Sequence, residues 1–203
     1  MSFTQVPRNF DRLYRSKLFV PGSKPDLFTK VFSRSVPDSV CLDLEDSVAP
    51  ADKPQARRNV VKALNEVDFR NAFVTVRING LDTHWCYRDV IEIIEEGGSR
   101  LDAILIPKAG RGADIYAIDM LITQASEFAK LKKQIGLEVI IETAAGIEYI
   151  NEICMGSPRM QSVHFNPADF AASIGMRTTS IGGAQRDYQV LSDPDETGMR
   201  THH

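Results

Sequence analysis

Charged and polar side chains follow a series of short apolar runs in this sequence, at the point where each run ends. Four runs end in Asp43-Leu44-Glu45-Asp46, Arg77-Ile78-Asn79-Gly80, Pro107-Lys108 and Glu142-Thr143, and Asp169 follows a fifth. If the runs are parallel strands of a barrel, their carboxyl ends converge on the face where such folds carry active sites. One residue of this kind would be read as a helix cap or a loop ion pair, whereas five in succession indicate a site.

Glu142 and Asp169 are the candidate metal ligands. They follow neighbouring apolar runs, and two carboxylates can share one divalent cation. Hard oxygen ligands with positions left for water and substrate suit Mg²⁺. The alternatives are an acid pair in which one pKa is raised, or two unrelated helix caps.

Arg77 and Lys108 are the candidate cationic groups of the site. The Arg77 guanidinium could bind a carboxylate or offset charge on a developing oxyanion. An ion pair with Glu45 or Asp46 is its structural alternative, and both roles are compatible. Lys108 could act as a Schiff-base nucleophile, but nothing in the sequence indicates that it is desolvated, so an ion pair is the favoured interpretation.

Other catalytic motifs find little support. The sequence has no GxSxG elbow and no GxGxxG or GxxxxGK[ST] loop, which are typical of hydrolases and of nucleotide-binding folds. Gly110-Arg111-Gly112 is interpreted as a loop. His164 lies inside an apolar run, where a hydrogen-bonded core histidine is the expected role.

The elements that must position these residues alternate between β-rich and helical patterns. Several of the apolar runs are apolar at consecutive positions, which is typical of strands buried on both faces of a parallel sheet. The helical stretches repeat apolar residues along one face. The expected strands are Ser16–Gly22, Ser39–Glu45, Ala72–Asn79, Ala103–Lys108, Leu137–Thr143 and Met160–Asn166, and the expected helices are Lys53–Leu64, Tyr87–Glu96, Ala113–Lys130 and Ala144–Met155.

This alternation predicts an α/β fold made of right-handed βαβ units. The polar strand ends and the missing glycine-rich first turn favour a (β/α)₈ TIM-type barrel over a doubly wound sheet. A chain of 203 residues is short of the roughly 250 typical of a full barrel, so we expect an incomplete barrel of about six βα units. Residues 1–15 are expected to be an extension, 16–190 the partial barrel and 191–203 a polar tail without strands.

Composition limits the class of protein. With 43% hydrophobic residues, 25% charged residues and a net charge of −3, the chain is typical of soluble globular proteins and unlike a dedicated nucleic-acid binder. No apolar run reaches the roughly 20 residues of a membrane span. The three cysteines form no CxxC pair, which favours a reducing, cytoplasmic location. Basic residues are concentrated in residues 1–34, as a solvated face or as an attraction for an anionic ligand.

Six motifs in this order carry a resemblance to a known family. They are Leu18-Phe19-Val20-Pro21-Gly22, Leu42-Asp43-Leu44-Glu45-Asp46-Ser47-Val48, Val76-Arg77-Ile78-Asn79-Gly80, Ile106-Pro107-Lys108, Ile141-Glu142-Thr143-Ala144-Ala145-Gly146 and Ala168-Asp169-Phe170. Together they resemble the citrate lyase β-subunit/HpcH aldolase superfamily. The stretches 77–83 and 169–183 are most similar to the malyl-CoA/β-methylmalyl-CoA lyases.

The resemblance implies a reversible carbon–carbon lyase that depends on Mg²⁺, or on Mn²⁺ in its place. Such enzymes split (S)-malyl-CoA into acetyl-CoA and glyoxylate, or β-methylmalyl-CoA into propionyl-CoA and glyoxylate, through metal-bound glyoxylate and a thioester enolate. By this resemblance Glu142 and Asp169 would ligate the metal, and Arg77 would be catalytic. Substrate or CoA would contact Phe19, Lys24, Lys30, Arg77, Ala168 and Asp169, and Glu45, Asp46 and Lys108 would support the site. A homo-oligomer, trimer or hexamer, is also implied.

Several alternatives stay open beside this hypothesis. On the same site they are a malyl-CoA thioesterase or a citryl-CoA or citramalyl-CoA lyase, and outside catalysis a truncated or assembly subunit. Members of the family usually carry a glycine before the metal aspartate, where this chain has Asn166-Pro167-Ala168, so an altered loop is expected. Members also continue through two more strands and a segment that supplies a catalytic aspartate, for which no counterpart is found after Gly183.

Overall fold

The structure, a computed structural model, describes residues 14–34, 36–176, 189–192 and 199–202. Strands and helices alternate along most of the described chain, as the sequence predicts. In chain order the elements are β1 (Lys17–Pro21), α1 (Asp26–Arg34), β2 (Ser39–Asp43), the 3₁₀ turn η2 (Pro50–Asp52), α2 (Lys53–Glu66), β3 (Phe73–Arg77), α3 (Cys86–Gly97), β4 (Ala103–Ile106), α4 (Gly112–Phe128), β5 (Gly136–Ile141), α5 (Ala144–Glu148), α6 (Ile150–Met155), β6 (Met160–Phe165), α7 (Pro167–Ser173), β7 (Gln189–Ser192) and β8 (Met199–His202).

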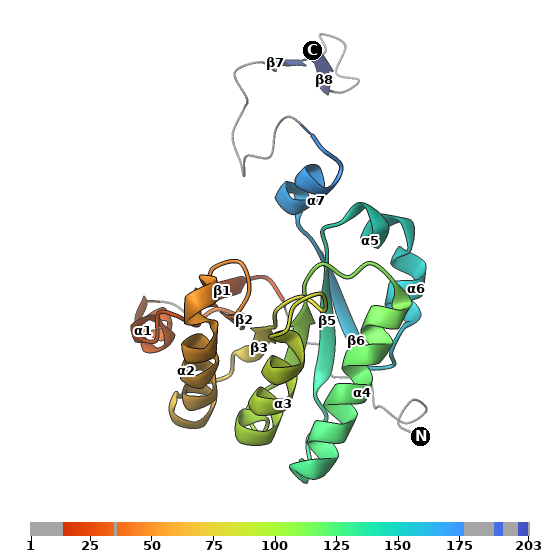
Figure 1. Ribbon diagram of the computed structural model, residues 1–203. Helices are drawn as coiled ribbons and strands as arrows, with labels where there is room; N and C mark the ends of the chain where they lie inside the picture. The colour runs from red at the N-terminus through yellow and green to blue at the C-terminus, as the bar shows by residue number, and fades with distance from the viewer. Residues whose placement is uncertain (1–13, 35, 177–188, 193–198, 203) are drawn as a thin grey trace.

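The first six strands form one parallel sheet in the order β1-β2-β3-β4-β5-β6. Each strand pairs with the strand that precedes it in the sequence, so every connection crosses the same face of the sheet. The helices α2, α3 and α4 lie side by side along that face (Figure 1). This arrangement confirms the predicted parallel α/β fold with six βα repeats.

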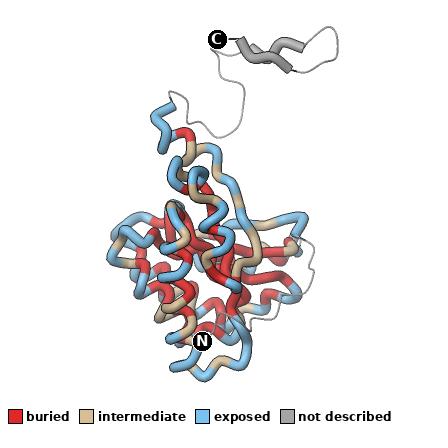
Figure 2. Tube along the Cα trace, turned by 90° about the vertical axis from the view of Figure 1, so that its right-hand side faces the viewer, coloured by how far each residue is buried: buried red, intermediate tan, exposed pale blue. Residues whose placement is uncertain are grey.

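The two faces of the sheet bury different kinds of side chain, because successive residues of a strand point to opposite sides. The outer face packs against the helices through apolar residues such as Leu42, Val76 and Ile104. The inner face carries a small apolar cluster of Cys41, Leu105 and Ile140 among polar side chains. Buried residues are concentrated in the strands and on the helix faces that cover them (Figure 2).

Two distant strands meet on the inner face, which shows that the sheet is curved. The Lys17 ammonium of β1 contacts the Glu138 carboxylate of β5, although three strands separate them in the sheet. Glu138 also accepts a hydrogen bond from Ser162 at 3.0 Å, and His164 lies 3.0 Å from the Ser162 hydroxyl. The edges β1 and β6 are not paired with each other, so the described part of the sheet is an open barrel arc.

Several features of the fold differ from the sequence predictions, including the helix α7, which was not among the expected helices. The helix α1 was not expected, although Phe28 and Phe32 form a buried face along it. The helix expected over Ala144–Met155 is divided into α5 and α6 at Tyr149, whose backbone leaves the helical region. The Tyr149 side chain packs on Arg111, whose guanidinium carbon lies 3.9 Å from the centre of the ring.

The polar tail expected over 191–203 contains two short strands among the residues that the structure describes there, and β7 begins just before it. The strands β7 and β8 pair antiparallel with each other in a separate sheet. A short hairpin of this kind needs no long apolar run and no helical crossover, which explains why the sequence pattern did not reveal it. These strands do not extend the parallel sheet.

The start of the described chain is tied to the sheet. The expected extension 1–15 lies outside the described residues except for Tyr14 and Arg15. Arg15 donates from its backbone and its guanidinium to the Asp38 carboxylate at 2.8 to 3.1 Å. Within the described ranges, no helix is long and apolar enough to span a membrane.

Candidate active site

Arg77 and Asp43 form a buried ion pair where β2 and β3 end. The two residues are register partners in the parallel pairing, and Arg77 donates from Nε and Nη2 to the two Asp43 oxygens at 2.7 and 2.6 Å. Burial raises the pKa of Asp43, but hydrogen bonds from Arg77 and Ser47 outweigh it, and the pKa is lowered. The structure also contains the ion pairs of Arg77 that the sequence suggested. Arg77 Nη1 lies 3.1 Å from Glu45 and 3.9 Å from Asp46. Asp43 was the partner that the sequence analysis missed.

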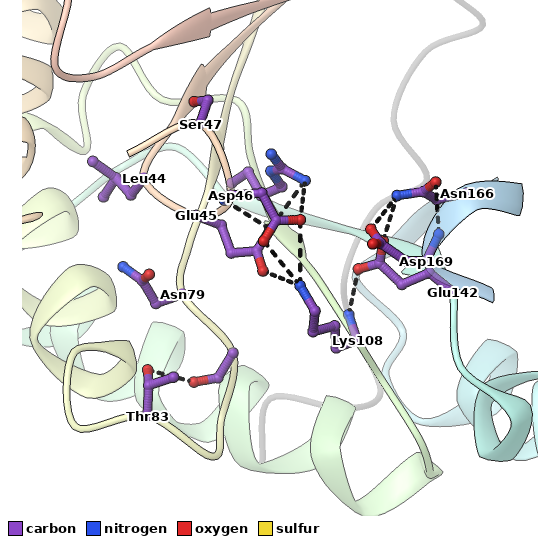
Figure 3. A network of polar contacts seen from close by, with 12 residues as sticks. Leu44, Glu45, Asp46, Ser47, Asn79, Thr83, Lys108, Glu142, Asn166 and Asp169 are labelled. Atoms are coloured by element: carbon purple, nitrogen blue, oxygen red, sulfur yellow. Dashed lines mark hydrogen bonds and ion pairs between the residues drawn. The ribbon is translucent and has the colours of Figure 1, made fainter. Parts of the chain in front are cut away.

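Lys108 contacts the other side of the same acidic loop. Its ammonium donates to Glu45 and lies 3.3 and 3.4 Å from the Asp46 oxygens (Figure 3). Burial lowers the pKa of Lys108, but Glu45 and Asp46 outweigh that effect and raise it. A Schiff-base lysine needs a lowered pKa, so the geometry agrees with the expected ion pair and opposes the nucleophile.

Glu142 and Asp169 converge on one amide group. Asn166 Nδ2 donates to Glu142 Oε2 at 2.8 Å and also to Asp169, while Asn166 Oδ1 accepts from the Ala168 and Asp169 backbone at 3.2 and 3.5 Å. Burial, together with the nearby Asp169 carboxyl, raises the pKa of Glu142 to about 7. The two carboxyl groups are therefore close neighbours, as the sequence predicted.

The unusual Asn166-Pro167 sequence has a regular structural role. Asn166 caps the start of α7, and Pro167 occupies the first turn of that helix. Proline is favoured there because its missing N–H would have no partner within the helix. The cap also fixes the amide group that both carboxylates contact.

The donor set of this acid pair suits a hard divalent cation. Glu142 and Asp169 supply carboxylate oxygens, whereas Mg²⁺ takes about six oxygen ligands and keeps several waters. The described residues contain no group of three or more His, Cys, Asp or Glu side chains that could hold a metal ion. A cation held by these two carboxylates would keep further positions for water and substrate, which is compatible with Mg²⁺.

Arg77 and Asn166 both line one cavity of about 460 Å³. Phe19 lines this cavity, and its ring lies 5.3 Å from the Arg77 guanidinium carbon. A second hollow of about 450 Å³ between β1 and α1 is lined by Phe19 and Lys30 among others. Phe19 thus lines both the cavity and the second hollow. Lys24 is exposed in the turn after β1.

Lys53 is a buried residue of the site region that sequence reasoning missed. It is 6% exposed, and its ammonium donates to the Leu44 and Glu45 carbonyls at 2.9 Å each. The Trp85 ring lies 5.4 Å from the same ammonium. Lys53 therefore anchors the backbone of the loop that presents Glu45 and Asp46. Nothing in the sequence distinguishes it from the exposed lysines.

Comparison with known proteins gives a consistent set of similarities. The sequence pattern of the HpcH/HpaI aldolase/citrate lyase family matches residues 15–186. A relative from Rhodobacter capsulatus named L-malyl-CoA/beta-methylmalyl-CoA lyase is 53% identical over 94% of this chain and 60% of its own length. A malyl-CoA/beta-methylmalyl-CoA/citramalyl-CoA lyase of Chloroflexus aurantiacus is 37% identical over 78% of this chain and 46% of its own length.

Solved structures show the same fold. CitE of Mycobacterium tuberculosis, in complex with magnesium, acetoacetate and coenzyme A, matches with a TM-score of 0.62 and 27% identity over 84% of this chain and 55% of that chain. The chain spans about 60% of the length of the curated relatives that are 50–53% identical to it.

Proposed function

The chain belongs to the HpcH/HpaI aldolase/citrate lyase family, and we propose that it carries the metal and thioester site of a Mg²⁺-dependent lyase. The substrate would be (S)-malyl-CoA or β-methylmalyl-CoA, and the products would be glyoxylate and acetyl-CoA or propionyl-CoA. The observation that carries the proposal is the convergence of Glu142 and Asp169 on Asn166, across one cavity from Arg77. The names of the relatives that are 50–53% identical support the same substrates.

In the cleavage direction the substrate hydroxyl loses a proton and the bond between its carbon and the carbon beside the thioester breaks. The electron pair of that bond passes to the thioester as an enolate, and protonation at carbon yields the shorter acyl-CoA. The chain must therefore hold an anionic keto acid and offset charge on an enolate oxygen. Glu142 and Asp169 would hold the Mg²⁺, which supplies Lewis-acid polarisation of the glyoxylate carbonyl and a template for that acid.

Arg77 is the residue proposed to offset charge on the substrate. Asp43 accepts hydrogen bonds from Arg77 Nε and Nη2, and these bonds fix the plane of the guanidinium. Arg77 also lines the cavity. A guanidinium has five N–H donors, and those that Asp43 and Glu45 leave unused would serve a ligand oxygen there. A fixed cation of this kind stabilises developing negative charge without having to reorganise. Glu45 and Asp46 would support it together with Lys108.

The CoA portion is proposed to extend from the cavity past Phe19 toward the hollow beside α1. That side chain lines both the cavity and the hollow beside α1, so a ligand that extends from one to the other passes it. Lys30 in the hollow and Lys24 in the preceding turn would contact the phosphates of CoA. The Ala168 backbone and Asp169 would lie against the keto acid.

Release of acetyl-CoA and glyoxylate from malyl-CoA, with and without Mg²⁺, tests the proposal. Glu142→Ala should lower the rate by roughly 10²-fold or more, because metal polarisation contributes several kcal/mol and each 1.36 kcal/mol is a factor of ten. Equal activity in Glu142→Ala would overturn the metal assignment. A folded chain that releases neither product at saturating Mg²⁺ would show that these 203 residues do not suffice for the reaction.

Product analysis separates the alternatives. Free CoA without a keto acid would indicate a thioesterase, and a keto acid other than glyoxylate from citramalyl-CoA would indicate the activity named for the Chloroflexus aurantiacus relative.

A further inference from the structure

Lys108 has a backbone conformation that lysine rarely adopts. Its φ is +53°, in the left-handed region that favours glycine and, to a lesser degree, asparagine. Within the described ranges Arg70 and Lys130 share this property, but local structure explains both. Lys130 follows the C-cap of α4, where left-handed residues are common. Arg70 lies in a turn closed by the Asp68 carboxylate.

Lys108 has neither explanation, because it lies just beyond the end of β4 at the candidate site. A strained residue persists only when its surroundings hold it in place, and such residues cluster at functional sites. What the conformation achieves can be seen in Figure 3. The Lys108 backbone N–H donates to Glu142 Oε1 at 2.8 Å, while its ammonium contacts Glu45 and Asp46 on the opposite side.

We propose that Lys108 is a positioning residue whose left-handed backbone orients Glu142 for the cation. The backbone N–H fixes one Glu142 oxygen, and Asn166 fixes the other at 2.8 Å. The ammonium separately neutralises Glu45 and Asp46, which keeps these two acids from competing for the cation. Lys108 thereby connects the loop acids Glu45 and Asp46, which lie beside Arg77, to the metal-ligand candidate Glu142. This inference rests on the proposed function, since it assumes that Glu142 is a metal ligand.

Four substitutions at this position separate the backbone from the side chain. Lys108→Gly, Lys108→Asn, Lys108→Ala and Lys108→Val all remove the ammonium, but glycine and asparagine adopt the left-handed region more readily than alanine and valine. Mg²⁺ binding to the full chain without substrate is measured by isothermal titration calorimetry. The glycine and asparagine variants should bind Mg²⁺ within about threefold of each other, and the alanine and valine variants about tenfold more weakly, the range typical of lost partners to metal ligands.

Lys130→Val is the matched control. It places the same residue in a left-handed position of the same kind, but at the end of α4 and away from the acid pair. It should lower the midpoint of thermal unfolding and leave the Mg²⁺ dissociation constant unchanged. Should Lys108→Val fail to fold, the comparison of glycine with alanine decides the outcome.

Equal Mg²⁺ affinity in all four Lys108 variants would overturn the proposal, because the backbone conformation would then have no influence. If Lys130→Val weakened Mg²⁺ binding as much as Lys108→Val, the effect would be general destabilisation and the proposal would fail too. A folded wild-type chain that binds no Mg²⁺ would instead refute the proposed function, and this inference with it. The two failures are therefore distinguishable.

Discussion

Asp43 accepts two hydrogen bonds from Arg77 inside the protein. Each of these buried charges is stabilised by the opposite charge of its partner. Both side chains are buried, at 1% and 8% exposure. Replacing Asp43 by Asn keeps the shape but leaves the guanidinium charge without its main partner. Since breaking a buried pair on one side is strongly destabilising, the free energy of unfolding should fall by about 3 kcal/mol. Urea denaturation of Asp43→Asn measures the change.

Glu66→Gln is the control for this prediction, because Glu66 pairs with Lys62 on the exposed face of α2. Its effect should be within about 0.5 kcal/mol. The double variant Asp43→Leu with Arg77→Met should lose less stability than the two single variants together, because no unpaired charge then remains. The ion pair would have no structural importance if Asp43→Asn behaved like Glu66→Gln.

At the residue scale the sequence predicted which side chains gather but not all of their partners. Arg77, Lys108, Glu142 and Asp169 were identified because each lies at or shortly after the end of a strand, and parallel strands end together. Asp43 was missed as the main partner of Arg77, because the pairing depends on the strand register, which the residue pattern does not fix. Lys53 could not be found either, since its burial depends on how η2 and α2 fold over the acidic loop.

At the element scale, Gly112 allows α4 and α6 to approach closely. A Cβ atom at Gly112 would lie 2.8 Å from the Glu152 carbonyl oxygen of α6, and a backbone atom cannot move aside as a side chain can. Glycine to alanine usually stabilises a compatible site by about 0.4–1 kcal/mol through the unfolded chain. The overlap here should outweigh that gain, since overpacking costs about 1–3 kcal/mol. Gly112→Ala should therefore lower the melting temperature in a thermal unfolding experiment.

Gly110→Ala provides the comparison, two residues earlier in the loop that precedes α4. Its Cβ would meet only ordinary contacts, the nearest atoms being 3.6 Å away. This variant should be neutral or slightly stabilised. Equal melting temperatures for the two variants would refute the close-approach role of Gly112.

The elements themselves were predictable where apolar periodicity was strong. All six strands of the parallel sheet were expected, because buried parallel strands consist of consecutive apolar residues. The division at Tyr149 was not expected, since the apolar pattern of Ile147, Ile150 and Ile153 continues across it. The packing of Tyr149 on Arg111 is a tertiary contact that periodicity along the chain does not report.

At the scale of the whole molecule, the curvature of the sheet brings a buried ion pair together. Lys17 and Glu138 are 121 residues apart in the sequence and lie on strands that are not neighbours. Glu138 interrupts an apolar run as an inward-facing residue that is fully buried, and the sequence does not indicate which cation would meet it. The pair nevertheless provides a measurable consequence of the barrel-like curvature.

In the wild-type chain the pKa of Glu138 is lowered, because contacts with His164 and Lys17 outweigh the burial that raises it. The stabilisation from this ionised carboxylate is present above the ordinary pKa of about 4.3 and is lost as the pH falls through the lower folded value. In Lys17→Met the burial effect is less opposed, so the pKa of Glu138 should rise. The variant then loses stability as the pH rises through that new value.

The gap in unfolding free energy between the wild type and Lys17→Met should therefore be small near pH 4 and grow to about 3 kcal/mol by pH 7, as for a buried charge that has lost its partner. Guanidinium chloride unfolding at several pH values between these limits measures it. Adding Glu138→Gln to Lys17→Met removes the carboxyl group that titrates, so the gap should become flat with pH. A gap of constant size in the single variant would mean that Lys17 does not govern the ionisation of Glu138, and that β1 and β5 are not coupled through this pair.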